Sequence, residues 1–238
     1  GELLSINDYN VHKNKIYISD RQQGKVAIFD LEGGFIQEFR ISDIIVDRLH
    51  IIDVDRILTF SMKTGENVFN IINTNGEVIE SFVKTEADLH YLMYSGDVSY
   101  KEGELYFAGY SEPILKKYDL GEKSLSYSVN TVKSYTTEGN YITSEIGGFK
   151  SSRYTPAALY NSLAHTVYKD TLYMTRHHNG EIEGKLIDVY NSNTGEYIQS
   201  YKLEYYPRIY GIAADENYIY SLEQSKGNKE WLIVYKKK

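Results

Sequence analysis

The sequence contains no cysteine and only three proline residues. The lack of cysteine excludes disulfides, thiolate metal sites and cysteine nucleophiles. No apolar run approaches the roughly 20 residues that a membrane-spanning helix needs, so we expect no membrane span. Proline interrupts strands, and its scarcity therefore removes an obstacle to an all-β fold.

An excess of positive charge is also lacking, because the formal net charge is −7 and the only basic run is Lys236–Lys238. Proteins that bind nucleic acid carry a basic stripe or patch. Acidic residues are spread along this chain instead of standing in blocks. We therefore expect no nucleic-acid partner.

Tyrosine is abundant, with 24 residues in a chain of 238. Aromatic side chains favour the pleated, half-buried surface of a β-sheet. A compact chain of this length can bury roughly 70–75% of its unfolded surface. The sequence therefore predicts an all-β fold, and we expect a single domain over residues 1–238.

Five similar apolar segments recur along the chain, and each follows a short polar turn. They are Asn14–Asp20, Asp55–Ser61, Gly103–Gly109, Asp170–Arg176 and Asn217–Glu223. A short apolar stretch precedes each turn, which predicts a β-hairpin. Downstream turns rich in Asp, Asn and Gly begin a second hairpin at Asp30, Asn73, Asp119 and Asn191. The repeating unit is therefore four antiparallel strands.

These strands are apolar on both sides. In Lys15–Asp20, for example, Ile16 and Ile18 alternate with Tyr17. A sheet with one solvent-exposed face would instead alternate apolar and polar residues along each strand. A sheet that is apolar on both faces must lie between two neighbours, and radial repetition of such sheets is a β-propeller. An unrelated β-sandwich is the alternative.

The ends of the chain predict how the ring closes. The last unit stops after its third strand, and Gly1–Ile6 resembles an isolated fourth strand. We therefore expect the N-terminal strand to pair with the C-terminal blade. Residues 131–163 do not show a clear pair of hairpins. We count five blades, or six if 131–163 is a degenerate blade; as an insertion, this segment would cap the loop face.

The segments Lys15–Asp20, Gly24–Phe39 and Gly211–Glu223 resemble those of bacterial NHL-like and TolB-like β-propellers. The resemblance covers most of the chain, but its motifs are strand, turn and strand. It implies a propeller fold, often six-bladed, in proteins that are often exported and mostly have no assigned activity. From this resemblance we expect an exported protein, periplasmic or at the cell surface. The chain begins with Gly1 instead of Met, which a removed signal peptide or an expression scar would both explain.

In a propeller, the connections into the first strand and out of the second strand of each blade share one face. Binding sites of ring-shaped folds tend to form where such loops converge. His50 and His165 each stand eight residues before the central second-strand residue, which predicts equivalent positions. The candidate ligand-binding residues on this face are Arg21, Arg48, His50, Asp97, Tyr110, Tyr154, His165, Arg176, His177, Arg208 and Tyr210.

Aromatic faces with interleaved Arg and His groups suit a glycan, a peptide or a protein partner. We therefore expect a non-catalytic binding or scaffold protein, monomeric and without a cofactor. For single residues, the alternative is that tyrosines pack the loops and charges are solvated.

A propeller hydrolase or lyase, similar to lactonases, is the alternative function. It would hold a metal ion such as calcium in the central channel, and a hard cation needs six to eight oxygen ligands. The sequence offers Asp8, Asp97 and Glu223 there. His177 and His178 are adjacent, so on a strand they would point to opposite faces and would not bind one ion together. We expect no catalytic residue and no metal site.

Overall fold

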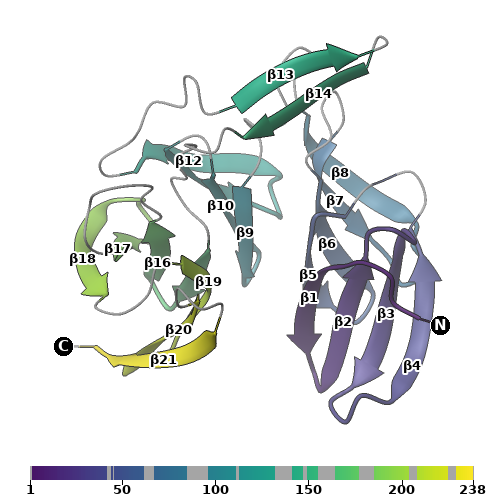
Figure 1. The fold of residues 1–238 in the computed structure, drawn as a ribbon, viewed down its shortest axis with the longest axis horizontal. Coiled ribbons are helices and arrows are strands. Elements are labelled where there is room, and N and C mark those ends of the chain that lie inside the picture. The colour runs from purple at the N-terminus through teal and green to yellow at the C-terminus, as the bar shows by residue number, and fades with distance from the viewer. Residues whose placement is uncertain are drawn as a thin grey trace. The chain divides into compact units, whose positions relative to one another are not determined.

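The computed structural model describes residues 2–41, 44, 46–61, 67–84, 96–110, 113–131, 141–146, 149–154, 164–176, 185–203, 208–224 and 229–237. Within them the chain forms β-strands and no helix (Figure 1). None of the described residues belongs to a helix long and apolar enough to cross a membrane. The all-β prediction is therefore confirmed.

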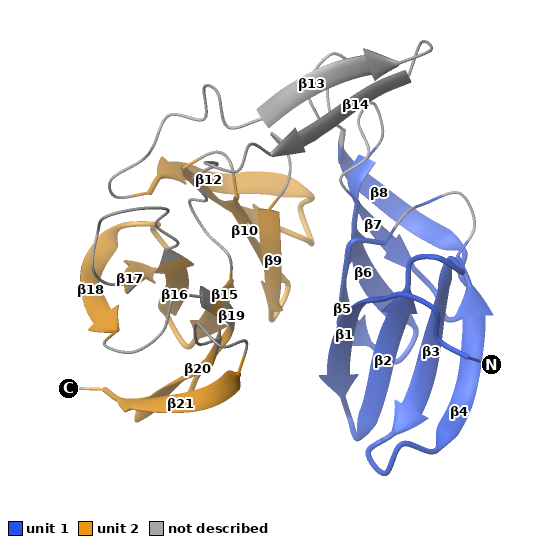
Figure 2. Cartoon of the chain, in the orientation of Figure 1, with its two compact units in different colours: residues 1–91 blue, residues 92–238 orange. Residues whose placement is uncertain are grey.

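The chain divides into two compact units, Gly1–Tyr91 and Leu92–Lys238, coloured separately in Figure 2. Each unit is described by itself. The expectation of a single domain over residues 1–238 stays a prediction.

The first unit contains two blades, each a four-stranded antiparallel meander. Blade 1 consists of β1 (Ile6–His12), β2 (Lys15–Asp20), β3 (Lys25–Asp30) and β4 (Phe35–Arg40). Blade 2 consists of β5 (Arg48–Asp53), β6 (Arg56–Phe60), β7 (Asn67–Ile72) and β8 (Val78–Lys84).

The second unit contains three blades and a separate hairpin. Blade 3 consists of β9 (Gly96–Lys101), β10 (Glu104–Gly109), β11 (Ile114–Asp119) and β12 (Ser124–Asn130). Blade 4 consists of β15 (His165–Tyr168), β16 (Thr171–Arg176), β17 (Lys185–Asn191) and β18 (Tyr197–Leu203). Blade 5 has three strands, β19 (Arg208–Ala214), β20 (Tyr218–Gln224) and β21 (Glu230–Lys236).

Five meander sheets of this kind make the fold a five-bladed β-propeller, as the sequence predicts. The five recurrent segments are the second strands β2, β6, β10, β16 and β20. The predicted Asp and Asn residues begin the turns between third and fourth strands. Asn73, for example, accepts hydrogen bonds at Oδ1 from the backbone N–H groups of Asn75 and Glu77, both at 3.0 Å.

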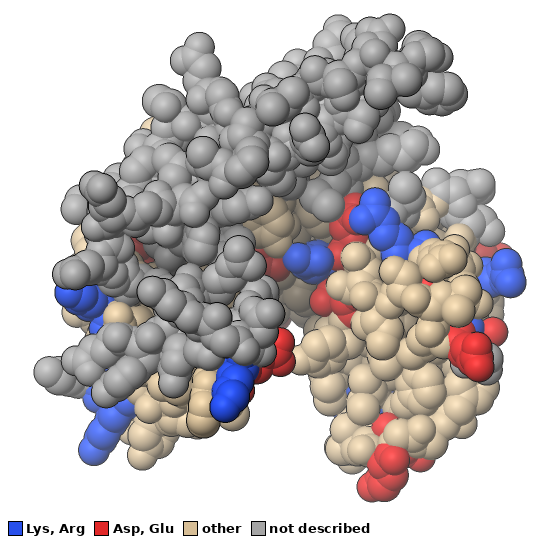
Figure 3. Space-filling view, in the orientation of Figure 1, with Lys and Arg blue, Asp and Glu red and all other residues tan. Residues whose placement is uncertain are grey.

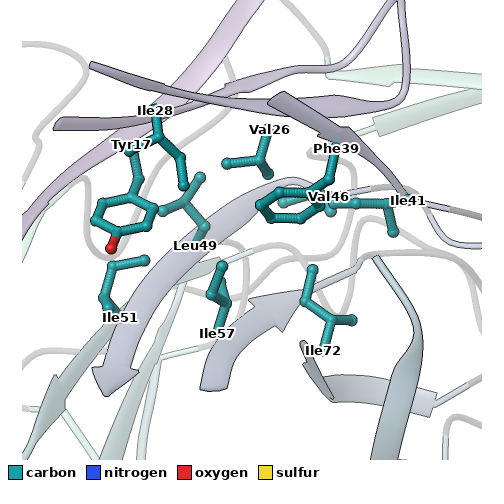
Figure 4. Packing of buried hydrophobic residues seen from close by; sticks show 10 residues of the cluster. All are labelled: Tyr17, Val26, Ile28, Phe39, Ile41, Val46, Leu49, Ile51, Ile57 and Ile72. Carbon is teal, nitrogen blue, oxygen red and sulfur yellow. The ribbon is translucent and has the colours of Figure 1, made fainter. Parts of the chain in front are cut away.

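The core lies between neighbouring blades because each sheet is apolar on both faces. Side chains of blades 1 and 2 form a buried cluster that includes Val26, Ile28, Leu49 and Ile57 (Figure 4). In blade 4, alternate residues of β16 serve two clusters. Leu172 and Met174 pack with residues of blade 3, whereas Tyr173 packs with residues of blade 5. The strand alternation therefore produces two buried faces instead of one.

The predicted closure of the ring by Gly1–Ile6 joins the two compact units and stays a prediction. Residues before β1 bind blade 1: Ser5 O accepts a hydrogen bond from the Arg21 backbone N–H at 3.0 Å, and Glu2 O accepts one from Gln23 Nε2 at 2.6 Å. Among the described residues, the last sheet has three strands.

The long segment 131–163 contains one described hairpin, β13 (Tyr141–Ile146) with β14 (Phe149–Tyr154). A hairpin supplies two strands, whereas a blade needs four. The count of five blades therefore holds, and the described part of the segment does not add a sixth. Its predicted role as a cap stays a prediction.

Two equivalent turn glycines allow a test of blade packing. Gly33 and Gly76 have φ angles of +85° and +83°, but a Cβ at Gly33 meets nothing within 4 Å, whereas one at Gly76 would lie 1.7 Å from Arg40 O. We expect Gly33→Ala to cost about 1 kcal/mol, the ordinary penalty of a left-handed conformation. Gly76→Ala should cost about 2 kcal/mol more, because β4 and the turn must separate. Urea denaturation measures both, and equal losses would contradict the close approach.

Candidate functional site

A cavity of about 310 Å³ opens in the first unit where β2 ends. Its walls come from the β2–β3 connection, Arg21–Gly24, and from the connection between β4 and β5, which contributes Ile41, Ile44 and Val46. The sequence placed a binding face at these two kinds of connection, out of a second strand and into a first strand. The polar side comes from the tight connection after β2, and the apolar side from residues that also face the blade core.

Asp20 anchors the polar wall. Although the residue is buried, its Oδ2 accepts hydrogen bonds from the Leu4 backbone N–H at 2.6 Å and from Gln23 Nε2 at 2.9 Å, and its Oδ1 accepts one from the Gln23 backbone N–H at 3.1 Å. Burial by itself would raise the pKa of Asp20, but the hydrogen bonds from Leu4, Gln23 and Ser5 outweigh it, and the pKa is lowered. The carboxylate therefore holds the connection in one conformation.

Lys25 lines the same polar side of the cavity. Its ammonium group is buried and lies 2.7 Å from Glu38 Oε2 on the neighbouring strand β4. This hydrogen bond is the main reason why the pKa of Glu38 is lowered. Since a buried charge is tolerated only when it is paired, this ion pair fixes both side chains.

Arg21 also lines the cavity. Its Nη1 is 3.4 Å from Asp47 Oδ1, and half of its side chain is exposed while that of Asp47 is buried. The Asp47 backbone is itself fixed, because Asp47 O accepts hydrogen bonds from Asn7 Nδ2 at 2.7 Å and from Arg48 Nη1 at 2.8 Å. A guanidinium has five N–H donors in a fork, so Arg21 keeps donors for a ligand while its ion pair positions it.

The structure thus brings two of the predicted site residues, Arg21 and Arg48, together around Asp47. His50 lies in β5 and Tyr110 directly after β10, and both are half-buried. On the face shown in Figure 3, acidic and basic side chains of the described residues are interspersed.

Asp97 and His165 lie together at the junction of blades 3 and 4. Asp97 Oδ2 accepts a hydrogen bond from the His165 backbone N–H at 3.0 Å and lies 3.3 Å from His165 Nδ1. His165 Nε2 lies 3.1 Å from Tyr106 O, and the imidazole is fully buried. These contacts fasten one blade to the next.

The same fastening occurs between blades 1 and 2, where Asp8 Oδ2 accepts a hydrogen bond from the Leu49 backbone N–H at 2.8 Å. Asp8 and Asp97 hold the same register position in their blades, opposite Ser19 and Ala108. The sequence placed both carboxylates at the channel as metal ligands of the alternative function. The geometry gives each a structural partner in the next blade.

The predicted equivalence of His50 and His165 is wrong. His50 pairs with Leu58, but His165 pairs with Met174, one position further along the second strand. A β-bulge between Ile51 and Asp53 adds one residue to β5. A shift of one residue turns a side chain to the opposite face of a sheet, so residue counting failed here.

The other candidates are placed by their backbone alone. Tyr154 ends β14, Arg176 ends β16, and Arg208 and Tyr210 lie in β19. His177 lies outside the described residues. The ligand-binding roles of these residues stay predictions.

Sequence reasoning did not single out Gln23, Lys25 and Asp47. Lys25 carried a signal, because it begins the apolar strand sequence KVAIFD, where an exposed face is not expected. Asp47 and Gln23 carried none, since polar residues in connections are ordinary. Among the residues that the structure describes, no group of three or more His, Asp or Glu side chains is placed to hold a metal ion.

No protein-family model matches the chain, and no curated protein matches it at a significant level. Solved structures do match. The computationally designed Ika8 protein is 12% identical with a TM-score of 0.57, covering 99% of this chain and 72% of that one. Hydrazine synthase of Kuenenia stuttgartiensis is 11% identical with a TM-score of 0.64, covering 100% of this chain and 64% of that one.

BamB of Moraxella catarrhalis is 10% identical with a TM-score of 0.47, covering 92% of this chain and 69% of that one. At these identities the likeness concerns the fold alone. The fold and its blade junctions therefore define the class, a β-propeller.

Asp20 allows a pH test of the cavity wall. We expect Asp20→Asn to lower the free energy of unfolding at pH 7, because the variant loses a carboxylate that accepts several hydrogen bonds. Since the folded-state pKa lies below the usual 3.8, this contribution is complete above that value and disappears as the pH falls through the lowered pKa. Urea denaturation of both proteins between pH 7 and pH 2 measures the difference. A difference independent of pH would contradict the role of the charge.

Asp97 allows a test of the blade fastening. We expect Asp97→Ala to destabilise the protein by about 1–3 kcal/mol, because the buried His165 N–H loses its acceptor. Asp97→Asn keeps an acceptor oxygen and should lose less. Asp8→Ala provides the matched change between blades 1 and 2. An unchanged free energy of unfolding in both alanine variants would show that the junctions do not depend on these carboxylates.

Proposed function

We propose that this β-propeller is a non-catalytic binding protein whose first unit recognises a glycan or a peptide through the cavity at Arg21. The cavity carries the proposal. Its volume of about 310 Å³ is at the lower end of the range for small-molecule sites. It has room for one sugar ring or for one or two amino-acid side chains.

The chemistry of the walls supports this ligand class. Gln23 and Arg21 present hydrogen-bonding groups on one side, and Ile41, Ile44 and Val46 form an apolar surface on the other. Sugars and peptides combine polar edges with apolar faces, so they match such a pair of walls. The charged groups Asp20 and Lys25 are held by internal hydrogen bonds, so they support the wall without needing the ligand.

The support of the cavity also favours binding. The connection after β2 is held by hydrogen bonds from Gln23 to the buried Asp20 carboxylate, which gives a preformed wall and lowers the entropic cost of association. Export and membership in the NHL-like or TolB-like propellers are part of this proposal, and they rest on the sequence resemblance. A protein partner that inserts one side chain into the cavity would use the same contacts.

Ligand screening with variants tests the proposal. A glycan array and a peptide library would identify a ligand, and isothermal titration calorimetry would measure its affinity. We expect Arg21→Ala to weaken binding about tenfold or more, since a hydrogen bond to a charged group contributes about 1.5–3 kcal/mol. Gln23→Ala should weaken it less.

Arg56→Ala is the matched control, because Arg56 is an exposed arginine of β6 that does not line the cavity. Its affinity should equal that of the unchanged protein. If Arg21→Ala and Arg56→Ala bind the ligand equally well, the ligand does not occupy this cavity.

Metal analysis separates binding from the hydrolase or lyase alternative. Protein purified without chelator should contain calcium and zinc well below one equivalent, and a chelator should leave the melting temperature unchanged. A near-stoichiometric metal together with a chelator-sensitive hydrolase activity would contradict the non-catalytic proposal.

A further inference from the structure

The charged side chains that line the cavity have partners inside the protein. Arg21 lies 3.4 Å from Asp47, and Lys25 lies 2.7 Å from Glu38. Asp20 accepts hydrogen bonds at both of its carboxylate oxygens. These five groups comprise two positive and three negative charges. A charged ligand would lose hydration without meeting an unpaired opposite charge among them, and an anion would also meet a small excess of negative charge.

The side-chain amide of Gln23 has one orientation. Its Nε2 donates a hydrogen bond to Glu2 O at 2.6 Å and another to Asp20 Oδ2 at 2.9 Å. A carbonyl and a carboxylate can only accept, so the amide nitrogen must face them, and both of its N–H donors are used. The amide oxygen Oε1 accepts no hydrogen bond from the described residues. Because Gln23 lines the cavity, Oε1 is an acceptor that a ligand can use.

Arg21 offers the complementary groups. Half of its side chain is exposed, and its guanidinium has five N–H donors and no acceptor. The cavity therefore presents donors at Arg21 and an acceptor at Gln23. A carboxylate only accepts and an ammonium group only donates, whereas a hydroxyl group does both. A ligand with neighbouring hydroxyl groups satisfies both residues.

The size of the cavity favours a ring over an extended chain. Its volume of about 310 Å³ suits a compact ligand. Peptides are mostly bound as extended or helical segments along a sheet edge or a groove. A sugar ring instead combines several hydroxyl groups with an apolar C–H face in one compact unit, and Ile41, Ile44 and Val46 supply an apolar wall for that face.

We propose that the cavity recognises one uncharged sugar residue of a glycan, and that Gln23 Oε1 accepts a hydrogen bond from one of its hydroxyl groups. Arg21 donates to a neighbouring hydroxyl group, and the apolar wall contacts the C–H face of the ring. The balanced charges of the wall select against acidic sugars. This inference rests on the proposed function, because it names the ligand class of the same cavity.

Matched pairs of sugars test the selection against charge. The probes are the methyl glycosides of glucose, galactose and mannose, and of the corresponding uronic acids, in which a carboxylate replaces the exocyclic hydroxymethyl group. Isothermal titration calorimetry at pH 7 measures each affinity. We expect saturable binding of at least one neutral glycoside. Its uronic acid counterpart should bind at least about tenfold more weakly, because the carboxylate loses hydration without a partner.

A deoxy series locates the contact with Gln23. Each hydroxyl group of the glycoside that binds is removed in turn, and every analogue is measured with the unchanged protein and with Gln23→Met. We expect Gln23→Met to weaken binding of the parent glycoside about threefold to tenfold, the effect of one neutral hydrogen bond. One deoxy analogue should bind the unchanged protein more weakly than the parent but bind Gln23→Met equally well. A purely structural role of Gln23 would not single out one hydroxyl group.

Gln37→Met is the matched control, because Gln37 is an exposed glutamine of β4 that does not line the cavity. Its affinity for the parent glycoside should equal that of the unchanged protein. The comparison of neutral and acidic sugars uses the unchanged protein, so it does not depend on the folding of any variant.

Three results would overturn the inference. The first is that no neutral glycoside binds, or that a uronic acid glycoside binds as tightly as its neutral counterpart. The second is a deoxy series with the same losses in Gln23→Met as in the unchanged protein. The third is a peptide that binds in place of a sugar and loses affinity in Arg21→Ala, in which case the proposed function stands and only the ligand class is wrong. If neither sugars nor peptides respond to Arg21→Ala, the proposed function fails as well.

Discussion

Burial of both faces of each blade is the constraint on which the rest of this structure depends. A sheet with one apolar face can be covered by a single layer. In β16, however, Leu172 and Met174 are buried on one face and Tyr173 is buried on the other. Each such side chain contributes roughly 1.5–3 kcal/mol when it is buried. Blades of this kind are stable only beside other blades, so the repeat and the propeller fold have one cause.

The stacking of blades also determines where polar side chains are needed. Where first strands of adjacent blades approach each other, a backbone N–H of the next blade needs an acceptor, and Asp8 and Asp97 supply it to Leu49 and His165. The cavity at Arg21 depends on the same junction, because its walls join the end of β2 to the connection that leads into β5. The candidate site is thus formed by loops that the packing of blades 1 and 2 brings together.

Much of the fold could be predicted because its signals are local. The period of two in strands such as Lys15–Asp20, and turn residues such as Asn73, act through neighbours in the sequence. The place of Arg21 at the end of a second strand was predictable for the same reason. The β-bulge in β5 was not, because an extra residue in a strand leaves no composition signal, and it moved His50 to the opposite face. The burial of His165 also depends on a neighbouring blade, which lies far away in the sequence.

By itself, the sequence determined the strand pattern and the side of the blade at which loops gather, since alternation and turn chemistry are properties of short segments. It left five or six blades open, and the structure shows five. Only the tertiary structure decided which charged groups support the fold and which border a cavity. Asp97 and Arg21 are both charged residues of one predicted face, but one fastens two blades and the other borders a cavity. Tertiary structure also decided that the residues before β1 bind the connection after β2. The physical reason is that a polar side chain takes its role from the partners that folding brings to it, and those partners lie in other blades.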